Sequence, residues 1–203
     1  VASTISGGFG NLIEVDGGYG TISGGQQNQI IAPAGTNQWE SLTNAVPLQR
    51  TGQTATELEL ELFRYLQPRY GEIYAELLVS GPGLQRLYES LGAIRGQDIQ
   101  SLSPEEISAK ALAGHCELCA LTLNTFCALL GSISGDFILA NGAYGGLYLA
   151  GGFVPRMIGF LQASPFVRRF QQKGKMRAYL AHVPMYVITC ETTGLLGAAH
   201  APL

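Results

Sequence analysis

The sequence reads Gly-Ala-Tyr-Gly-Gly-Leu-Tyr-Leu-Ala-Gly-Gly-Phe-Val-Pro-Arg from Gly142 to Arg156, and the fold prediction starts there. Its run 147–150 carries no charge and lies between paired glycines, as expected of a strand buried on both faces of a sheet. The pair Gly151 and Gly152 lets the main chain turn sharply and lets a ligand approach it closely. Pro155 can then open a helix at its first position. This arrangement presents free N–H groups to a nucleotide, although an ordinary strand-to-helix turn has the same pattern.

Several ordered motifs carry a resemblance to one family. The run from Tyr144 to Arg156 resembles the adenosine-side motif of bacterial glucokinases, which belong to the actin-like sugar kinase superfamily. Residues 166–180, 183–188 and 194–198 follow in the order of the same family, and residues 76–88 match it upstream. The resemblance implies an α/β fold, namely an actin-like ATPase (ribonuclease H-like) domain with a mixed sheet flanked by helices.

Composition limits the classes of function. The 203 residues suffice for one domain with a sizeable core, and charged residues make up 13% against the usual ~25%. A net charge of −3 gives no general attraction to nucleic acid or to an anionic membrane. We find no charge-free run with the sustained apolarity of a membrane span and no signal-peptide pattern. The expected location is therefore the cytoplasm, and the first residue, Val1, suggests a processed chain or a fragment.

Half of the basic residues fall in one segment. They are Arg156, Arg168, Arg169, Lys173, Lys175 and Arg177. Two readings are open: a solvated helix face, or a local patch that faces phosphate groups.

The cysteines raise the question of a metal. His115-Cys116-x-x-Cys119 suggests zinc, but a closed zinc site needs four ligands, usually from two such pairs, and the sequence has no second pair. In a helix, a set of mostly apolar residues shares one face, which predicts core packing instead. The set is Cys116, Cys119, Leu123, Phe126, Cys127 and Leu130. We therefore expect no metal site, and glucokinases without zinc carry similar cysteines here.

Residues 1–35 are rich in glycine and nearly free of charge. Strands are expected at 2–5, 11–15 and 19–22, with a hairpin signal at Asp16-Gly17-Gly18. The resemblance places Ser6-Gly-Gly-Phe-Gly10 where the family has the loop that holds ATP phosphates, and implies cofactor contacts at Gly8 and Gly10. We treat residues 1–35 as a glycine-rich β-hairpin segment and residues 36–203 as the C-terminal α/β domain.

This sequence departs from the family's sugar-binding motif. The aligned text runs from Gly24 to Pro33, where the family's Glu, His and Asp are replaced by Gly25, Asn28 and Ile30. Asn28 can still donate to and accept from a sugar hydroxyl, whereas Gly25 has no side chain to do so.

The resemblance assigns Glu76 to the family's sugar-binding glutamate. A carboxylate suits this role because it accepts two hydroxyl donors through charge-assisted bonds. An ordinary surface glutamate is the alternative reading of the same residue.

Helix signals fill most of the remaining chain. A helix is expected from Thr54 or Thr56 to a stop at Pro68 and Gly71. The next helix should start after Ser80 or Gly81 with Pro82 at its start, and its inward residues should be Leu84, Leu87, Tyr88 and Leu91. Two more are expected over 103–112, behind a Ser-Pro-Glu-Glu capping box, and over 115–139. A strand at 185–190 and a helix from Gly194 complete an α/β order. The three histidines, His115, His182 and His200, show no catalytic pattern.

The implied activity is ATP-dependent phosphorylation of glucose to glucose 6-phosphate, with Mg²⁺ bridging the phosphates. This reaction needs an Asp to take the hydroxyl proton, and the family's Asn-Asp-Phe motif does not occur in this chain. We therefore interpret the chain as the C-terminal portion of a glucokinase, without a catalytic residue and inactive alone. Two alternatives stay open: a non-catalytic nucleotide- or sugar-binding homologue, and a structural subunit kept for contacts in a homodimer.

Overall fold

The computed structural model describes residues 55–143 and 145–190 and, as backbone only, residues 3–6, 12–14, 20–23, 29–31 and 39–41. The chain divides into two compact units. The first unit combines residues 1–45, 134–158 and 170–203, and the second combines residues 46–133 and 159–169. The predicted division at residue 35 stays a prediction.

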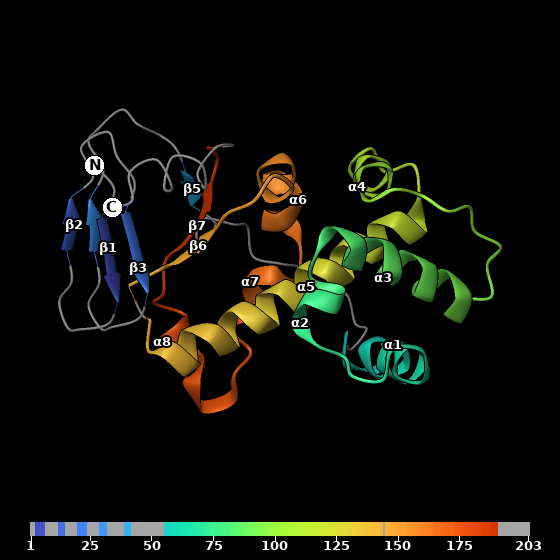
Figure 1. Ribbon diagram of the computed structural model, residues 1–203, viewed down its shortest axis with the longest axis horizontal. Helices are drawn as coiled ribbons and strands as arrows, with labels where there is room; N and C mark the ends of the chain where they lie inside the picture. Colours follow the sequence, from blue (N-terminus) through green and yellow to red (C-terminus); the bar gives the residue numbers. More distant parts are fainter. Residues whose placement is uncertain are drawn as a thin grey trace, which may run out of the picture. The chain divides into compact units, whose positions relative to one another are not determined.

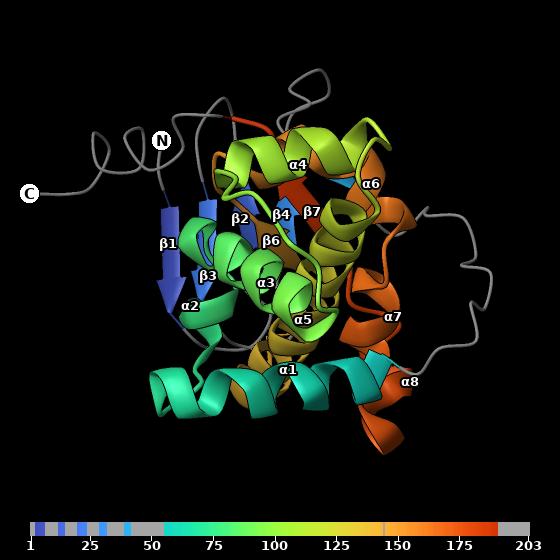
Figure 2. The same cartoon turned by 90° about the vertical axis from the view of Figure 1, so that its right-hand side faces the viewer.

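The second unit is built from helices (Figures 1 and 2). Its elements include α1 Ala55–Tyr70, α2 Ala75–Leu78, α3 Gly81–Ile94, α4 Pro104–Leu112, most of α5 Glu117–Asn141, most of α6 Ile158–Ala163 and the start of α7 Phe166–Gln171. Helix α3 contacts α1, α2 and α4, and α1 crosses beneath it in Figure 2. The helices predicted in this part of the chain are confirmed.

Helix α1 forms for the reason that its sequence indicates. Leu62 and Leu66, four residues apart, are fully buried and form the centre of its apolar stripe. Of the two predicted stop signals, Pro68 is wrong, because this proline lies inside the last turn, and Gly71 is confirmed. The helix ends before Gly71, which has a φ of +71° and donates its N–H to the carbonyl of Gln67.

Helices α3 and α4 begin at side-chain caps. Ser80 accepts a hydrogen bond from the N–H of Gly83 at 3.0 Å. In α4, Ser103 and Glu106 form the predicted capping box, with bonds of 3.2 Å and 2.8 Å between each side chain and the other's main chain. The predicted inward face of α3 is confirmed, since all four of its residues are buried: Leu84, Leu87, Tyr88 and Leu91.

Helix α5 is the longest element that the structure describes. By length and composition it could cross a membrane, contrary to the sequence expectation, but 67% of its apolar window is buried inside the protein. Cys119, Leu123 and Cys127 are fully inaccessible to solvent on its predicted inner face. Packing into the core therefore accounts for the apolar composition of this helix.

The first unit contains a mixed sheet of three strands. Figure 1 draws β7 Met185–Ile188 between β5 Trp39–Ser41 and β6 Leu147–Leu149. Strand β5 is antiparallel to β7 and β6 is parallel to it. The prediction that β6 is buried on both faces is wrong: β6 is an edge strand among the described strands, and only Leu149 is buried.

Short helical turns of the first unit lie between β6 and β7 in the chain. They include the 3₁₀ turns η1 Val154–Met157 and η2 Gly174–Met176 and the short helix α8 Arg177–Leu180. The predicted helix start at Pro155 is confirmed, although its first turn is 3₁₀ before α6 continues.

The first four strands pair at a constant offset. Strand β1 Ser3–Ser6 is parallel to β3 Gly20–Ser23, and β2 Leu12–Glu14 is parallel to β4 Gln29–Ile31. In both ladders each residue pairs with the residue 17 positions later. The sequence repeats at the same offset, since Thr-Ile-Ser-Gly-Gly occurs at 4–8 and again at 21–25.

This pairing corrects the predicted hairpin. A hairpin at Asp16-Gly17-Gly18 would join neighbouring strands in antiparallel pairing, whereas the described partners are parallel and not consecutive. Successive repeats of a solenoid stack in this way, because equivalent residues of one repeat lie over those of the next. The helix predicted from Gly194 lies outside the described residues.

Candidate functional site

The glycine turn after β6 leaves its main chain open. Gly151 has a φ of +133°, a conformation that side chains rarely adopt, and a Cβ at Gly151 or Gly152 would meet no described atom within 4 Å. Both residues are exposed, and their N–H groups donate to no acceptor in the described part of the chain. The turn therefore has the open main chain that the sequence predicts for contact with a ligand.

The strand ahead of this turn is fixed by an aromatic pair. Tyr148 of β6 lies opposite Tyr186 of β7, and their rings stack with centroids 5.0 Å apart and an interplanar angle of 20°. Burial raises the pKa of Tyr148 to about 12, so its phenol stays protonated at neutral pH. Stacking across the parallel ladder holds the residues that lead into Gly151.

Glu76 lies in the first turn of α2, in the second unit. It is exposed, and its carboxylate has no hydrogen bond or ion pair with the described residues. The carboxylate is therefore free to accept hydrogen bonds from a ligand. Gly151 and Gly152 belong to the first unit, so the described geometry does not combine them with Glu76 in one site.

Three residues hold the short helix that carries Glu76. Arg86 donates from Nη1 to the carbonyl of Leu77 at 3.0 Å, and Ser80 caps the helix that follows. Gly83 packs so closely that a Cβ there would overlap the carbonyl group of Leu78. The Ser-Gly-Pro-Gly run predicted the helix start at Ser80 or Gly81. No sequence pattern pointed to the close contact of Gly83 or to the hydrogen bond from Arg86.

A buried ion pair joins three helices of the second unit. Arg169 of α7 donates to Glu59 Oε2 of α1 at 2.8 Å and to Ser132 Oγ of α5 at 3.0 Å. The side chains of Arg169 and Glu59 are 12% and 9% exposed, and Glu59 Oε1 has no partner in the described part of the molecule. The sequence did not reveal this cluster, because its members are up to 110 residues apart.

The basic segment matches neither predicted reading as a whole. Arg169 is committed to Glu59, and Lys173 forms an ion pair with Asp136 at 2.6 Å. The other four basic residues are exposed: Arg156, Arg168, Lys175 and Arg177.

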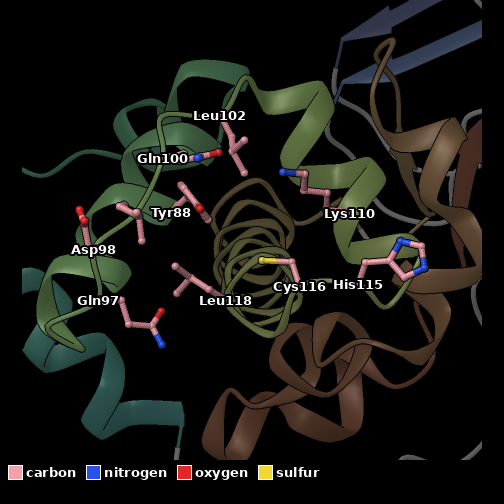
Figure 3. Close-up of a pocket in the computed structure, with 10 residues that line it drawn as sticks. Tyr88, Gln97, Asp98, Gln100, Leu102, Lys110, His115, Cys116 and Leu118 are labelled. Carbon is pink, nitrogen blue, oxygen red and sulfur yellow. The ribbon is translucent and has the colours of Figure 1, made fainter.

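A cavity of about 440 Å³ opens in the second unit. It is lined by Tyr88, Gln97, Asp98, Ile99, Gln100, Leu102, Lys110, His115, Cys116 and Leu118. Figure 3 shows Lys110 and His115 on one side of Cys116, with Tyr88, Leu118 and Asp98 on the other. Of the described residues predicted to bind glucose or ATP, namely Glu76, Gly151 and Gly152, none lines this cavity.

Other predicted residues lie elsewhere or outside the description. Gly8, Gly10 and Asn28 fall outside the described residues. Within the part that the structure describes, no three His, Cys, Asp or Glu side chains gather in a metal-binding group. Cys119 and Cys127 lie in the core as the helical spacing predicts.

Comparison with known proteins identifies the family. The glucokinase family model matches residues 49–202. The chain is 45% identical over 145 residues to a glucokinase of Saccharophagus degradans and 46% identical over 145 residues to one of Chromobacterium violaceum. These matches include 71% of this chain but only 45% and 42% of the two relatives, so the chain spans less than half of their length.

Solved structures agree with this result. The glucokinase of an Antarctic psychrotroph aligns with a TM-score of 0.70 at 31% identity, over 86% of this chain and 67% of that one. The glucokinase of Balamuthia mandrillaris, solved in complex with glucose, aligns with a TM-score of 0.59 at 20% identity, over 76% and 44% of the two chains. The second match shows a shared fold alone. With the open glycine turn in its expected place and the family model matching most of the sequence, this helix-rich α/β chain belongs to the glucokinase family.

Proposed function

We propose that this chain is the C-terminal portion of an ATP-dependent glucokinase that phosphorylates glucose to glucose 6-phosphate. The observation that carries the proposal is the match of the glucokinase model to residues 49–202, alongside relatives named glucokinase at 45–46% identity. The finer fold assignment, an actin-like ATPase of the ribonuclease H-like type, is part of the same proposal.

We assign the glycine turn after β6 to ATP binding and Glu76 of α2 to glucose binding. Gly151 and Gly152 would receive the adenosine side of ATP, because their N–H groups are open and no side chain blocks the approach. Glu76 would accept hydrogen bonds from two glucose hydroxyls, since its carboxylate is exposed and unpaired within the described residues. Gly8, Gly10 and Asn28 stay predictions for phosphate and sugar contacts, and they precede the part that matches the family model.

The reaction needs groups that this chain does not supply. A general base must take the proton of the sugar hydroxyl, and no Asn-Asp-Phe motif occurs in the sequence. Mg²⁺ would neutralise phosphate charge when bound with ATP, but the described residues hold no cluster of three ligands for it. This chain would bind and orient substrates without turning them over.

A coupled assay of glucose 6-phosphate formation tests this proposal. We expect no turnover by the purified 203-residue chain, and turnover by the chain preceded by the N-terminal half of the Saccharophagus degradans relative. Glu76→Gln in the joined protein should weaken glucose binding, whereas Glu72→Gln, another exposed glutamate near α2, should not. Turnover by the chain alone, with contaminating kinase excluded, would contradict the proposal.

A second candidate is a homologue that binds nucleotide or sugar without reaction. Gly25 and Asn28 favour it, because they replace the acidic and imidazole side chains of the family's sugar motif. A joined protein that binds ATP by calorimetry but forms no product would support this candidate. Binding of neither ATP nor glucose would point to a structural subunit. A homodimer, a cytoplasmic location and the lack of nucleic-acid or membrane partners stay predictions.

A further inference from the structure

The Cys-x-x-Cys sequence at the start of α5 has a geometry that core packing alone does not explain. Cys116 immediately precedes the helix, and its Sγ accepts a hydrogen bond from the N–H of Cys119 at 3.2 Å. The sulfur therefore caps the first turn of a 25-residue helix. Residues three apart in a helix are neighbours, so the two thiols lie on the same side of this first turn. Because Cys116 precedes the helix and Cys119 lies in its first turn, a disulfide between them requires only a local adjustment of this turn.

The two cysteines differ in access. Cys116 is half-buried and lines the 440 Å³ cavity, whereas Cys119 is fully buried. In Figure 3 the Cys116 side chain lies at the end of α5 facing the cavity, between Lys110 and His115 on one side and Tyr88 on the other. A reagent can thus reach the first sulfur but not the second.

The chemistry of the cavity indicates the class of reagent. Lys110 and His115 can bind carboxylates, Asp98 can bind an ammonium group, and Leu102 and Leu118 provide an apolar wall. A small peptide disulfide with free carboxylates and amines, such as oxidised glutathione, carries both kinds of charge.

We propose that Cys116 and Cys119 form a redox-active dithiol, in which Cys116 reacts with a low-molecular-weight disulfide in the cavity and Cys119 completes an internal disulfide. In the first step the Cys116 thiolate attacks one sulfur of oxidised glutathione, whose S–S bond breaks and releases one glutathione thiolate. A mixed disulfide remains on Cys116. Cys119 then loses its proton to water and attacks the Cys116 sulfur, releasing the second glutathione. Two protein thiols are oxidised as one glutathione disulfide is reduced.

The second step is expected to be slow at neutral pH. Burial, followed by the hydrogen bond with Cys116, raises the pKa of Cys119 to about 12, and nearby Lys110 lowers it by less. The titratable groups around this thiol are Tyr88 of α3, Lys110 of α4 and Cys116 itself. Since only the thiolate attacks, the internal disulfide should form faster as the pH rises.

The experiment uses the full chain with Cys190→Ser, which removes the other half-buried thiol. After treatment with oxidised glutathione and acid quenching, intact mass and peptide mapping identify each product. We expect Cys116 to react on the order of tenfold or more faster than the buried Cys127. Its glutathione adduct should convert to a Cys116–Cys119 disulfide, more rapidly at alkaline pH.

Two further variants sharpen the test. Cys119→Ser should stop at the adduct on Cys116, and Cys116→Ser should leave Cys119 unmodified. Because Cys119 is buried, circular dichroism first checks that each variant folds. Peptide mapping of the Cys190→Ser chain tests the proposal independently, because that chain keeps both Cys116 and Cys119. Equal labelling of Cys116 and Cys127, or an adduct that never converts at alkaline pH, would overturn the proposal.

Discussion

The second unit and the first four strands differ in how far apart in the sequence their interacting residues lie. In the second unit, caps, apolar stripes and one close glycine contact act within or between helices, as at Ser103 and Gly83. In the strands, residues pair with partners 17 positions later in two parallel ladders. The family model begins at residue 49, after these strands. The order of motifs along the chain suggested a phosphate loop in residues 1–35. Motif order does not specify whether the strands of this segment pair in parallel or antiparallel.

The largest effect should come from the buried ion pair of the second unit. Glu59→Ala leaves Arg169 buried without its carboxylate, and loss of one partner of a buried pair costs about 3–5 kcal/mol. The pair of Lys173 and Asp136 gives the control: its carboxylate is 68% exposed, so Asp136→Ala should cost less than Glu59→Ala, on the order of 1 kcal/mol. Urea denaturation of both variants measures the difference. Equal losses would show that the three-helix cluster does not anchor this unit.

The next effect concerns the contact between α2 and α3. Gly83→Ala places a Cβ against the carbonyl group of Leu78, and such overpacking costs about 1–3 kcal/mol. Gly81→Ala is the matched control, because no described atom lies within 4 Å of a Cβ there. Thermal unfolding compares the two variants. A Gly83 variant as stable as the Gly81 variant would contradict the close packing behind Glu76.

The ATP affinity of two glycine variants compares the turn after β6 with residues 1–35 directly. Gly151→Val should weaken ATP binding about tenfold, since a φ of +133° is strained for valine and strain of this kind costs about 1–3 kcal/mol. Gly8→Val separates the two interpretations of residues 1–35: a phosphate contact at Gly8 predicts weaker ATP binding, whereas repeat pairing alone predicts unchanged affinity. Calorimetry on the full chain, or on the joined protein used for the activity assay, measures both. A loss at Gly8 equal to that at Gly151 would restore the phosphate-loop interpretation.

The smallest effect should come from the capping box of α4. Ser103→Ala removes the acceptor for the N–H of Glu106 and should cost about 1 kcal/mol. Ser101→Ala, two residues earlier in the exposed loop, serves as the control and should change stability by less than about 0.5 kcal/mol. The free energy of unfolding from urea titration distinguishes them. Identical values would mean that this local signal contributes nothing to the helix.

Sequence reasoning was most successful where one residue's partners lie within a helical turn. The capping box of α4, the start of α3 after Ser80 or Gly81 and the inner face of α3 were all predicted from short local patterns. It failed where partners are distant in the chain, as for Glu59 and Arg169, 110 residues apart. It also mistook β6 for a strand buried on both faces, because an apolar run does not reveal which neighbours a strand will have.

The same distinction between local and distant partners applies to the candidate site. The glycine turn was predicted from its residue types, and the structure adds the φ of Gly151 and its open surroundings. Glu76 was assigned by resemblance, whereas the bond from Arg86 that fixes its helix appears only in three dimensions. The difference in access between Cys116 and Cys119 likewise depends on how α3 and α4 pack around α5.

The amino-acid sequence by itself determined the helices, their caps and the glycine turn, because hydrogen bonds and side-chain spacing within a few residues specify them. Tertiary structure alone decided the parallel pairing of the first strands, the edge position of β6, the buried ion pair and the exposure of one cysteine beside its buried neighbour. These features depend on burial and on contacts between distant segments, and a linear pattern does not encode which segments meet.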